Sequence, residues 1–106
     1  MKPFFVWKDK VLKRVDTEKV VCLVTDKNYT KIFLEDETHY EVRSTLTGAL
    51  EKLPEDVFIQ THRAYAVSIH HIDNIEKESL TVFKNEGIPI SKQFYDSVLE
   101  KLNIIE

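Results

Sequence analysis

Short apolar runs separated by polar turn residues dominate the first half of the chain. Because these runs are rich in β-branched and aromatic residues or alternate with period two, they predict strands at 4–7, 11–15, 20–24, 29–34 and 39–43. The run at 20–24 is nearly continuous, so we expect a strand buried on both faces, with Cys22 as a buried thiol. Asp26, Lys27 and Asn28 favour a turn, since Asp and Asn side chains bond their own backbone.

The spacing of apolar residues then changes to three and four. The apolar residues between Leu46 and Leu53 form one helical face, with Ser44 or Thr45 as the N-cap and Pro54 just past the end. Further short strands are predicted at 58–59, 64–67, 80–83 and 88–90.

Turn residues divide the second half of the chain. We predict a turn at Asp73 and Asn74, and a hairpin turn at 84–87 that contains Gly87. Ser91 can cap a final helix, whose buried side would carry Phe94, Tyr95, Val98, Leu99 and Leu102.

This order of elements predicts a mostly β fold of small antiparallel sheets with two short helices. Turn signals return about every 8–12 residues, which favours antiparallel pairing. Strands and helices do not alternate along the chain, so we do not expect a parallel sheet. A length of 106 residues fits one domain, 1–106. No apolar run approaches the roughly 20 residues that cross a bilayer, and the N-terminus resembles no signal peptide, so we expect a cytoplasmic protein without membrane contact.

Charge is distributed unevenly. The formal net charge is −3, to which residues 1–31 contribute +4 and residues 32–106 contribute −7. Proteins that bind DNA usually present a basic face, so the total argues against nucleic acid. A partner, however, meets a local distribution of charge, and the basic part can still bind DNA. A solvated surface of mixed charge is equally consistent with the count.

Neither a catalytic motif nor a metal cluster stands out. The chain has no nucleophile elbow and no phosphate loop, and its single cysteine excludes a disulfide and a cysteine-based zinc cluster. His62, His70 and His71 suggest a metal site, but adjacent histidines on a strand point to opposite faces. We therefore expect a protein that is not an enzyme and holds no cofactor or metal.

Three segments carry a family pattern. The central segment, Phe58–Val67, has an aromatic residue, a His-Arg pair, a small residue, an aromatic residue and a valine. The first segment contains Lys27–Ile32 and Arg43–Leu46, and the last runs from Leu80 through Gly87 to Lys92. In order and spacing, these segments resemble LytTR domains, the DNA-binding modules of bacterial transcriptional regulators. The resemblance covers Phe5–Leu102.

The resemblance implies an elongated fold whose loops, rather than a recognition helix, enter successive major grooves. It implies that double-stranded DNA is the partner, with two copies on tandem repeat sites, and that a receiver domain or a sensor acts upstream. The implied function is sequence-specific DNA binding in transcription regulation. The alternative is a LytTR-like module for protein interaction with weak or no DNA binding, which the acidic total favours.

Three residues are candidates for base contacts. Arg63 can bond guanine O6 and N7 with two donors, whereas Lys92 stands where the family usually has arginine and offers only a point charge. Asn28 can pair with adenine. The alternatives are an arginine paired with an acidic neighbour, a solvated helix lysine and a turn former that contacts nothing.

A second group consists of candidates for phosphate contacts: Lys27, Lys31, Arg43, Ser44, Thr45, His62 and Gln93. His62 could instead support the loop that carries Arg63, and Ser44 and Thr45 could serve only as helix caps. The chain also departs from the family at Gln60, where arginine is common, which removes a phosphate contact. Ser68 stands where the family commonly has asparagine, and Val24 stands where it often has an acidic residue.

Overall fold

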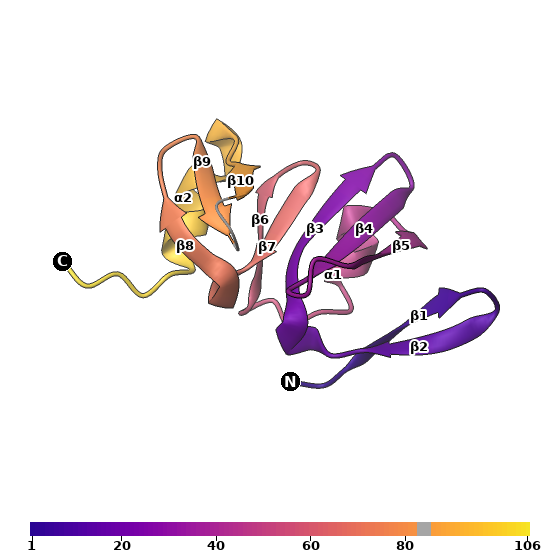
Figure 1. The fold of residues 1–106 in the computed structure, drawn as a ribbon. Coiled ribbons are helices and arrows are strands. Elements are labelled where there is room, and N and C mark those ends of the chain that lie inside the picture. The colour runs from indigo at the N-terminus through magenta and orange to yellow at the C-terminus, as the bar shows by residue number, and fades with distance from the viewer. Residues whose placement is uncertain (83–85) are drawn as a thin grey trace.

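Three small antiparallel sheets form the fold (Figure 1). The computed structural model describes residues 1–82 and 86–106. The β1–β2 hairpin consists of β1 (Phe4–Lys8) and β2 (Val11–Val15). The five-stranded sheet has the order β5 (His39–Arg43), β4 (Tyr29–Leu34), β3 (Val20–Asp26), β7 (Tyr65–Ser68) and β6 (Phe58–His62). The three-stranded sheet has the order β10 (Glu86–Pro89), β9 (Ser79–Val82) and β8 (Ile72–Ile75).

Helical segments complete the chain. The two α-helices are α1 (Leu46–Leu50) and α2 (Lys92–Glu100), and two short 3₁₀ turns span Thr17–Lys19 and Ile69–His71. The principal dimensions of 48 × 26 × 24 Å confirm the elongated, mostly β fold with two short helices.

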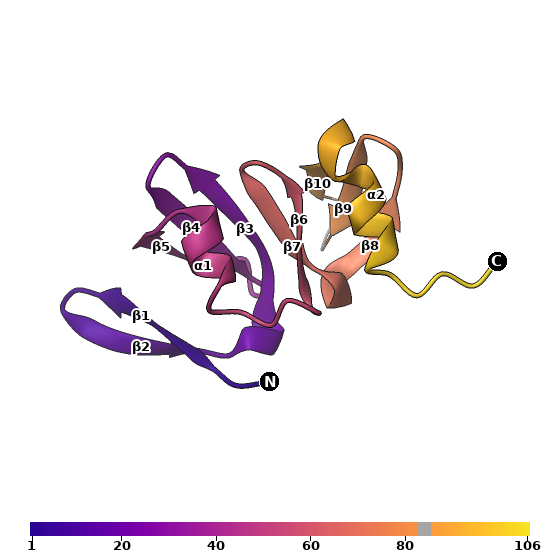
Figure 2. The same cartoon turned by 180° about the vertical axis from the view of Figure 1, so that it is seen from behind.

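Both faces of the five-stranded sheet are covered. On one face, α1 and the β1–β2 hairpin pack around Leu23 and Ile32 (Figure 2). On the other face, the three-stranded sheet and α2 pack around Cys22, Ile59 and Val98. Leu23 and Cys22 are neighbours on β3 that face opposite cores, because successive strand side chains point to opposite faces. The expectation of a strand buried on both faces, and of a buried thiol at Cys22, is confirmed.

Tight turns join the strands. Two residues, Asp9 and Lys10, connect β1 to β2 with φ values of 50° and 65°, the left-handed backbone that such hairpin turns require. Lys27, with φ 57°, opens the two-residue turn between β3 and β4. In the turn after β4, the hydroxyl and the backbone N–H of Thr38 donate to Asp36, which lowers the pKa of that carboxyl group.

The first helix is shorter than predicted. It ends at Leu50, and the following N–H groups of Lys52 and Leu53 donate to carbonyls only three residues back. Pro54 explains this early end, because the residue before a proline is disfavoured in the α conformation. The N-cap is Thr45, whose hydroxyl oxygen accepts from the N–H of Gly48 at 3.0 Å.

Several predictions in the second half are wrong in detail. Asp73 and Asn74 lie inside β8 rather than in a turn, and the ladder is irregular between Ile72 and Asn74. Glu86 and Gly87 lie in β10 rather than in a turn, with Gly87 opposite Thr81, and residues 84 and 85 of the predicted turn lie outside the described residues. Ser91 occupies the N-cap position of α2, but its side chain makes no capping hydrogen bond.

Candidate nucleic-acid interface

The tips of several loops lie along one edge of the molecule, the upper edge in Figure 1. We call this the loop edge; it comprises the turns at 27–28 and 63–64 and the start of α2 at 91–93. We include the β5–α1 junction at 43–45, which lies lower in Figure 1 but where Arg43 pairs with Tyr29 beside the first of these turns. Two backbone hydrogen bonds tie its parts together. The Thr25 N–H donates to the Ala64 carbonyl at 2.8 Å, and the Ser91 N–H donates to the Thr61 carbonyl at 2.9 Å. The fold thus brings the sequence-predicted residues to one edge from segments that lie far apart in the chain.

Arg63 is carried by a turn that is held from within. His62 Nδ1 accepts a hydrogen bond from the Ala64 N–H at 3.1 Å, and the His62 ring packs edge-on against Tyr65. Gln60 Nε2 donates to the His62 carbonyl at 3.1 Å. The supporting contact considered for His62 is therefore present, and it leaves the Arg63 side chain exposed at the tip of the turn.

At the start of α2, Lys92 and Gln93 are both exposed. The helix is amphipathic, with Val98 fully buried against the core and its polar side facing solvent. Because the Ser91 backbone is bonded to Thr61, two residues before Arg63 along the chain, Lys92 begins its helix close to the turn that carries Arg63.

Asn28 and Lys27 form the exposed tip of the β3–β4 hairpin. Lys31 lies further along β4, exposed and opposite Glu41 on β5. A hollow of about 400 Å³ lies beside this tip, and its lining includes Lys27, Asn28, Lys31 and Glu41. The three candidates from this hairpin are therefore brought together, with two carboxylates, Asp26 and Glu41, among them.

The β5–α1 junction is fixed by a chain of hydroxyl groups. Thr30 Oγ1 donates to the Ser44 carbonyl at 2.8 Å and lies 2.7 Å from Thr25 Oγ1. Ser44 Oγ donates to the Thr45 carbonyl, and Thr45 caps α1. Both hydroxyls are thus engaged in local bonds, but only Thr45 makes the capping contact that was expected. Arg43 stands opposite Tyr29 and is exposed.

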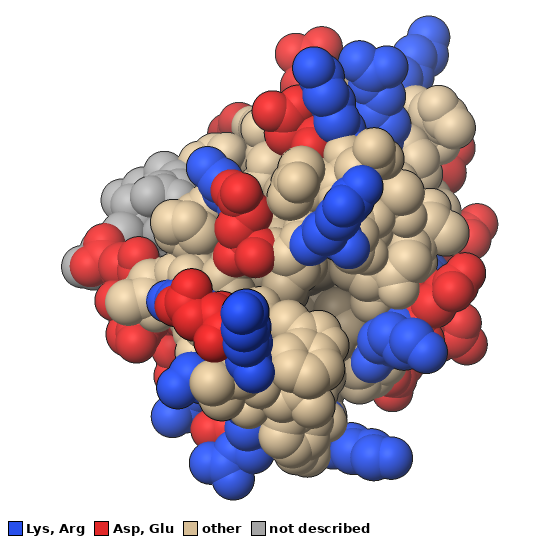
Figure 3. Space-filling model, turned by 90° about the vertical axis from the view of Figure 1, so that its right-hand side faces the viewer, with Lys and Arg blue, Asp and Glu red and all other residues tan. Residues whose placement is uncertain are grey.

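The candidate cations are not neutralised by ion pairs. Within residues 1–82 and 86–106, no ion pair involves any of Lys27, Lys31, Arg43, Arg63 or Lys92. The alternative of an Arg63 held by an acidic neighbour therefore finds no support. Acidic residues nevertheless stand near the loop edge, namely Asp26, Glu41 and Glu78. Figure 3 shows basic and acidic side chains interspersed over the side of the molecule that it presents.

The histidines differ from the expected arrangement. His70 and His71 lie in a 3₁₀ turn rather than on a strand, and His71 Nε2 lies 3.2 Å from Glu35 Oε2. No group of three metal-ligating side chains occurs in the part of the chain that the structure describes. Among the same residues, no helix has the length and apolar character to cross a membrane.

Comparison with known proteins adds to this geometry. The model of the LytTr DNA-binding domain family matches residues 10–103. The chain belongs to this family. The family is one of DNA-binding domains rather than enzymes, and its members act in transcription regulation.

Two curated relatives of this LytTr domain are sensory transduction proteins LytT, one from Enterococcus faecalis and one from Bacillus subtilis. Each is 26% identical over 95 residues, which cover 85% of this chain and 39% of the relative. The chain therefore spans well under half of their length. A solved LytTr DNA-binding domain from Bacillus cereus superposes with a TM-score of 0.76 over 95% of both chains at 24% identity, which establishes the shared fold.

Sequence reasoning missed residues of the LytTr domain that shape the loop edge. Tyr29 is 49% exposed beside Asn28 and opposite Arg43, and the strand alternation that places Lys31 on one face also places Tyr29 there. Thr30 is fully buried, yet its hydroxyl holds the Ser44 backbone. No sequence signal identifies Thr30, because its bond depends on strand pairing between residues 14 positions apart.

Proposed function

We propose that this LytTr domain binds double-stranded DNA sequence-specifically by inserting the loop edge into the major groove. The observation that carries the proposal is the pair of backbone bonds, Thr25 to Ala64 and Ser91 to Thr61, which holds three exposed tips at one edge. Arg63, Lys92 and Asn28 then contact base edges, because arginine, lysine and amide groups match the acceptors and donors of that groove.

In this proposal the remaining candidates position the duplex through its phosphates. Lys27, Lys31 and Arg43 supply charge, while Ser44, Thr45, His62 and Gln93 stand beside them. Residues 1–106 act as one DNA-binding unit in the bacterial cytoplasm, and two copies occupy tandem repeat sites. The relatives named for sensory transduction are longer than this chain, so we propose a receiver domain or sensor of a two-component system as the upstream partner.

The proposal is tested by selecting binding sites from a random DNA pool and then comparing variants on the selected site. Arg63→Ala is expected to lose about 1–3 kcal/mol of binding free energy and to relax the preference at one base pair. Arg14→Ala is the matched control, because Arg14 lies on the β1–β2 hairpin, away from the loop edge, and pairs with Asp16. Equal affinity of Arg63→Ala and the parent for the selected site contradicts the proposed readout.

A protein-interaction module is the second candidate, and the carboxylates beside the loop edge favour it. Asp26, Glu41 and Glu78 would repel phosphates and would suit a basic protein partner instead. The two functions differ in salt dependence, since DNA binding releases counterions and weakens steeply with added salt. If the selection enriches no DNA sequence and no salt-dependent binding of DNA is detected in a mobility-shift assay, the function as a protein-interaction module is favoured.

A further inference from the structure

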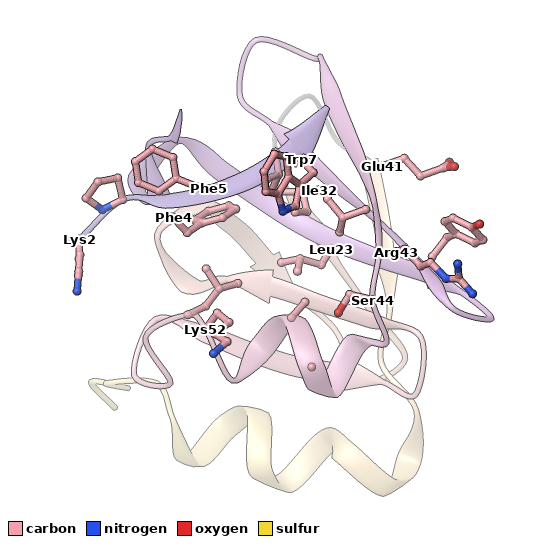
Figure 4. Close-up of a pocket in the computed structure, with 17 residues that line it drawn as sticks. Lys2, Phe4, Phe5, Trp7, Leu23, Ile32, Glu41, Arg43, Ser44 and Lys52 are labelled. Carbon is pink, nitrogen blue, oxygen red and sulfur yellow. The ribbon is translucent and has the colours of Figure 1, made fainter. Parts of the chain in front are cut away.

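A pocket that is open to solvent lies on the face of the five-stranded sheet opposite α2. It opens between β1, the outer part of that sheet and α1 (Figure 4) and encloses about 870 Å³. That volume falls within the roughly 300–1,000 Å³ typical of small-molecule sites. At one end it reaches the loop edge through Arg43 and Ser44, but none of the three proposed base-contacting residues lines it.

The interior of the pocket is apolar. Phe4 and Trp7 of β1 form one wall, while Leu23 and Ile32 form the floor. On α1, the pocket meets Gly48, which has no side chain, and Ala49, which has only a methyl group. A Cβ on Gly48 would come within 3.1 Å of Ser44 Oγ and 3.2 Å of Thr45 Oγ1, so a larger residue there would crowd the helix cap. Trp7 is 67% exposed, so most of its surface remains in contact with solvent.

Cations predominate among the charged residues that line the pocket, although the domain as a whole is acidic. Lys2, Lys52 and Arg43 line it together with a single carboxylate, that of Glu41. Figure 4 shows Lys2 and Lys52 toward one end, and Arg43 and Glu41 toward the other. The hydroxyl of buried Thr17 donates to the Lys2 carbonyl at 2.7 Å, which anchors the backbone that carries the Lys2 side chain. In residues 1–82 and 86–106, none of these three cations is in an ion pair.

We propose that this pocket binds an amphipathic carboxylate, a free molecule with an apolar body and one anionic head. The body fills the space between Trp7 and Ala49, where apolar surface is removed from water. The carboxylate meets Lys2 and Lys52, which lie at the end of the pocket away from Glu41. A neutral or cationic head loses this attraction, so the charge of the lining residues determines the class of ligand.

Trp7 makes the proposal directly measurable, because it is the only tryptophan in the chain and lines the pocket. The experiment titrates the whole chain, without DNA, with sodium decanoate below its micelle concentration and follows the emission of Trp7. We expect a saturable blue shift with decanoate and several-fold weaker binding with decanol, which has the same chain length but no charge. Since DNA is absent, failure here leaves the proposed DNA function untouched.

Two variants and one control locate the site. Ala49→Phe fills the pocket and is expected to abolish the saturable shift. Lys52→Glu, an exposed substitution that should leave the fold intact, is expected to weaken decanoate binding by roughly three- to tenfold and to leave decanol binding unchanged. Lys101→Glu makes the same charge change just beyond α2 and should match the parent. Circular dichroism confirms the fold of each variant.

Three outcomes overturn the proposal. One is a Trp7 emission that does not saturate with decanoate. The second is equal decanoate affinity in the parent, Lys52→Glu and Lys101→Glu, which would show that the cations play no part. The third is a concentration-dependent dimer, detected by sedimentation, that buries Trp7 before any ligand is added, because a second copy of the chain would then be the occupant.

Discussion

Arg63 and Lys92 are exposed, but buried or backbone groups determine where they stand. The turn that carries Arg63 is closed by the bond from the Ala64 N–H to His62, and Lys92 follows a residue that is bonded to Thr61. Such support reduces the conformational freedom that binding would otherwise have to remove. The sequence motif of a His-Arg pair therefore combines a positioning residue with an exposed candidate for base contact.

Lys92→Arg tests whether the helix start reads a base. Arginine offers a planar fork that matches guanine, whereas lysine offers one mobile ammonium group. We expect tighter binding to sites with guanine at the matching base and nearly unchanged binding to other sites, while Lys92→Ala should cost less than Arg63→Ala. Competition of these variants against a site library at fixed salt measures the difference. Uniform tightening over all sequences would show a phosphate contact instead.

His62→Ala tests the positioning role at the same turn. The substitution removes the acceptor for the Ala64 N–H, so we expect a loss of about 1 kcal/mol of unfolding free energy. Base preference at the Arg63 position should relax more than affinity for random DNA falls. His70→Ala, an exposed histidine away from the loop edge, is the control. Chemical denaturation and the site library give the two readings; unchanged stability and preference together would refute a supporting His62.

At the level of elements, the strands were predictable because apolar runs and turn residues are local signals. The predicted strands at 20–24, 29–34 and 39–43 correspond to β3, β4 and β5. Errors arose where tertiary pairing overrides local preference: Asp73 and Asn74 favour turns, but Asn74 pairs with Thr81 of β9, and Asp73 lies in β8 where the register shifts. Gly87 likewise looks like a turn residue, yet it pairs with Thr81 in a strand.

The candidate site was only partly predictable for the same reason. The resemblance supplied the exposed residues at loop tips, but the bonds that hold those tips connect segments distant in sequence. Thr30 illustrates this, because nothing in its local pattern reveals that its hydroxyl reaches Ser44. Strand pairing has to be known before such a contact can be inferred.

Thr30→Val tests that contact in β4. Valine keeps the shape of threonine but leaves the Ser44 carbonyl and the Thr25 hydroxyl without their buried partner. We therefore expect the free energy of unfolding to fall by about 1–3 kcal/mol. Thr47→Val, at an exposed position of α1, should leave the stability unchanged. Thermal or urea unfolding of both variants decides the matter, and equal midpoints would show that the hydroxyl chain is not stabilising.

For the whole molecule, a net charge of −3 and an exposed group of cations are compatible because binding depends on the local field. Lys27 and Lys31 stand beside one hollow with Asp26 and Glu41, whereas Arg63 and Lys92 are in no ion pair with a described residue. The total charge should nevertheless keep binding to random DNA weak, and a larger share of the affinity should then come from the matched site.

Lys27→Ala and Lys31→Ala test the phosphate contacts. Each loss should reduce the slope of log affinity against log salt by roughly one and weaken binding evenly across sequences. Lys101→Ala, just beyond α2, should leave the slope unchanged. Affinities measured between low and physiological salt provide the slopes. If a variant changes the base preference but not the slope of log affinity against log salt, the lysine contacts a base rather than a phosphate.

The elongated shape has a consequence for how operator sites can be arranged. The long dimension of 48 Å corresponds to about 14 base pairs at roughly 3.4 Å each, which exceeds one helical turn of about 10.5 base pairs. In Figure 1 the longest direction runs from the C-terminal segment to the β1–β2 hairpin, and the loop edge occupies its middle part. If this dimension lies along the duplex, two copies on the same side overlap at a spacing of one turn. Repeats whose centres lie about two turns apart give each copy its own stretch of groove.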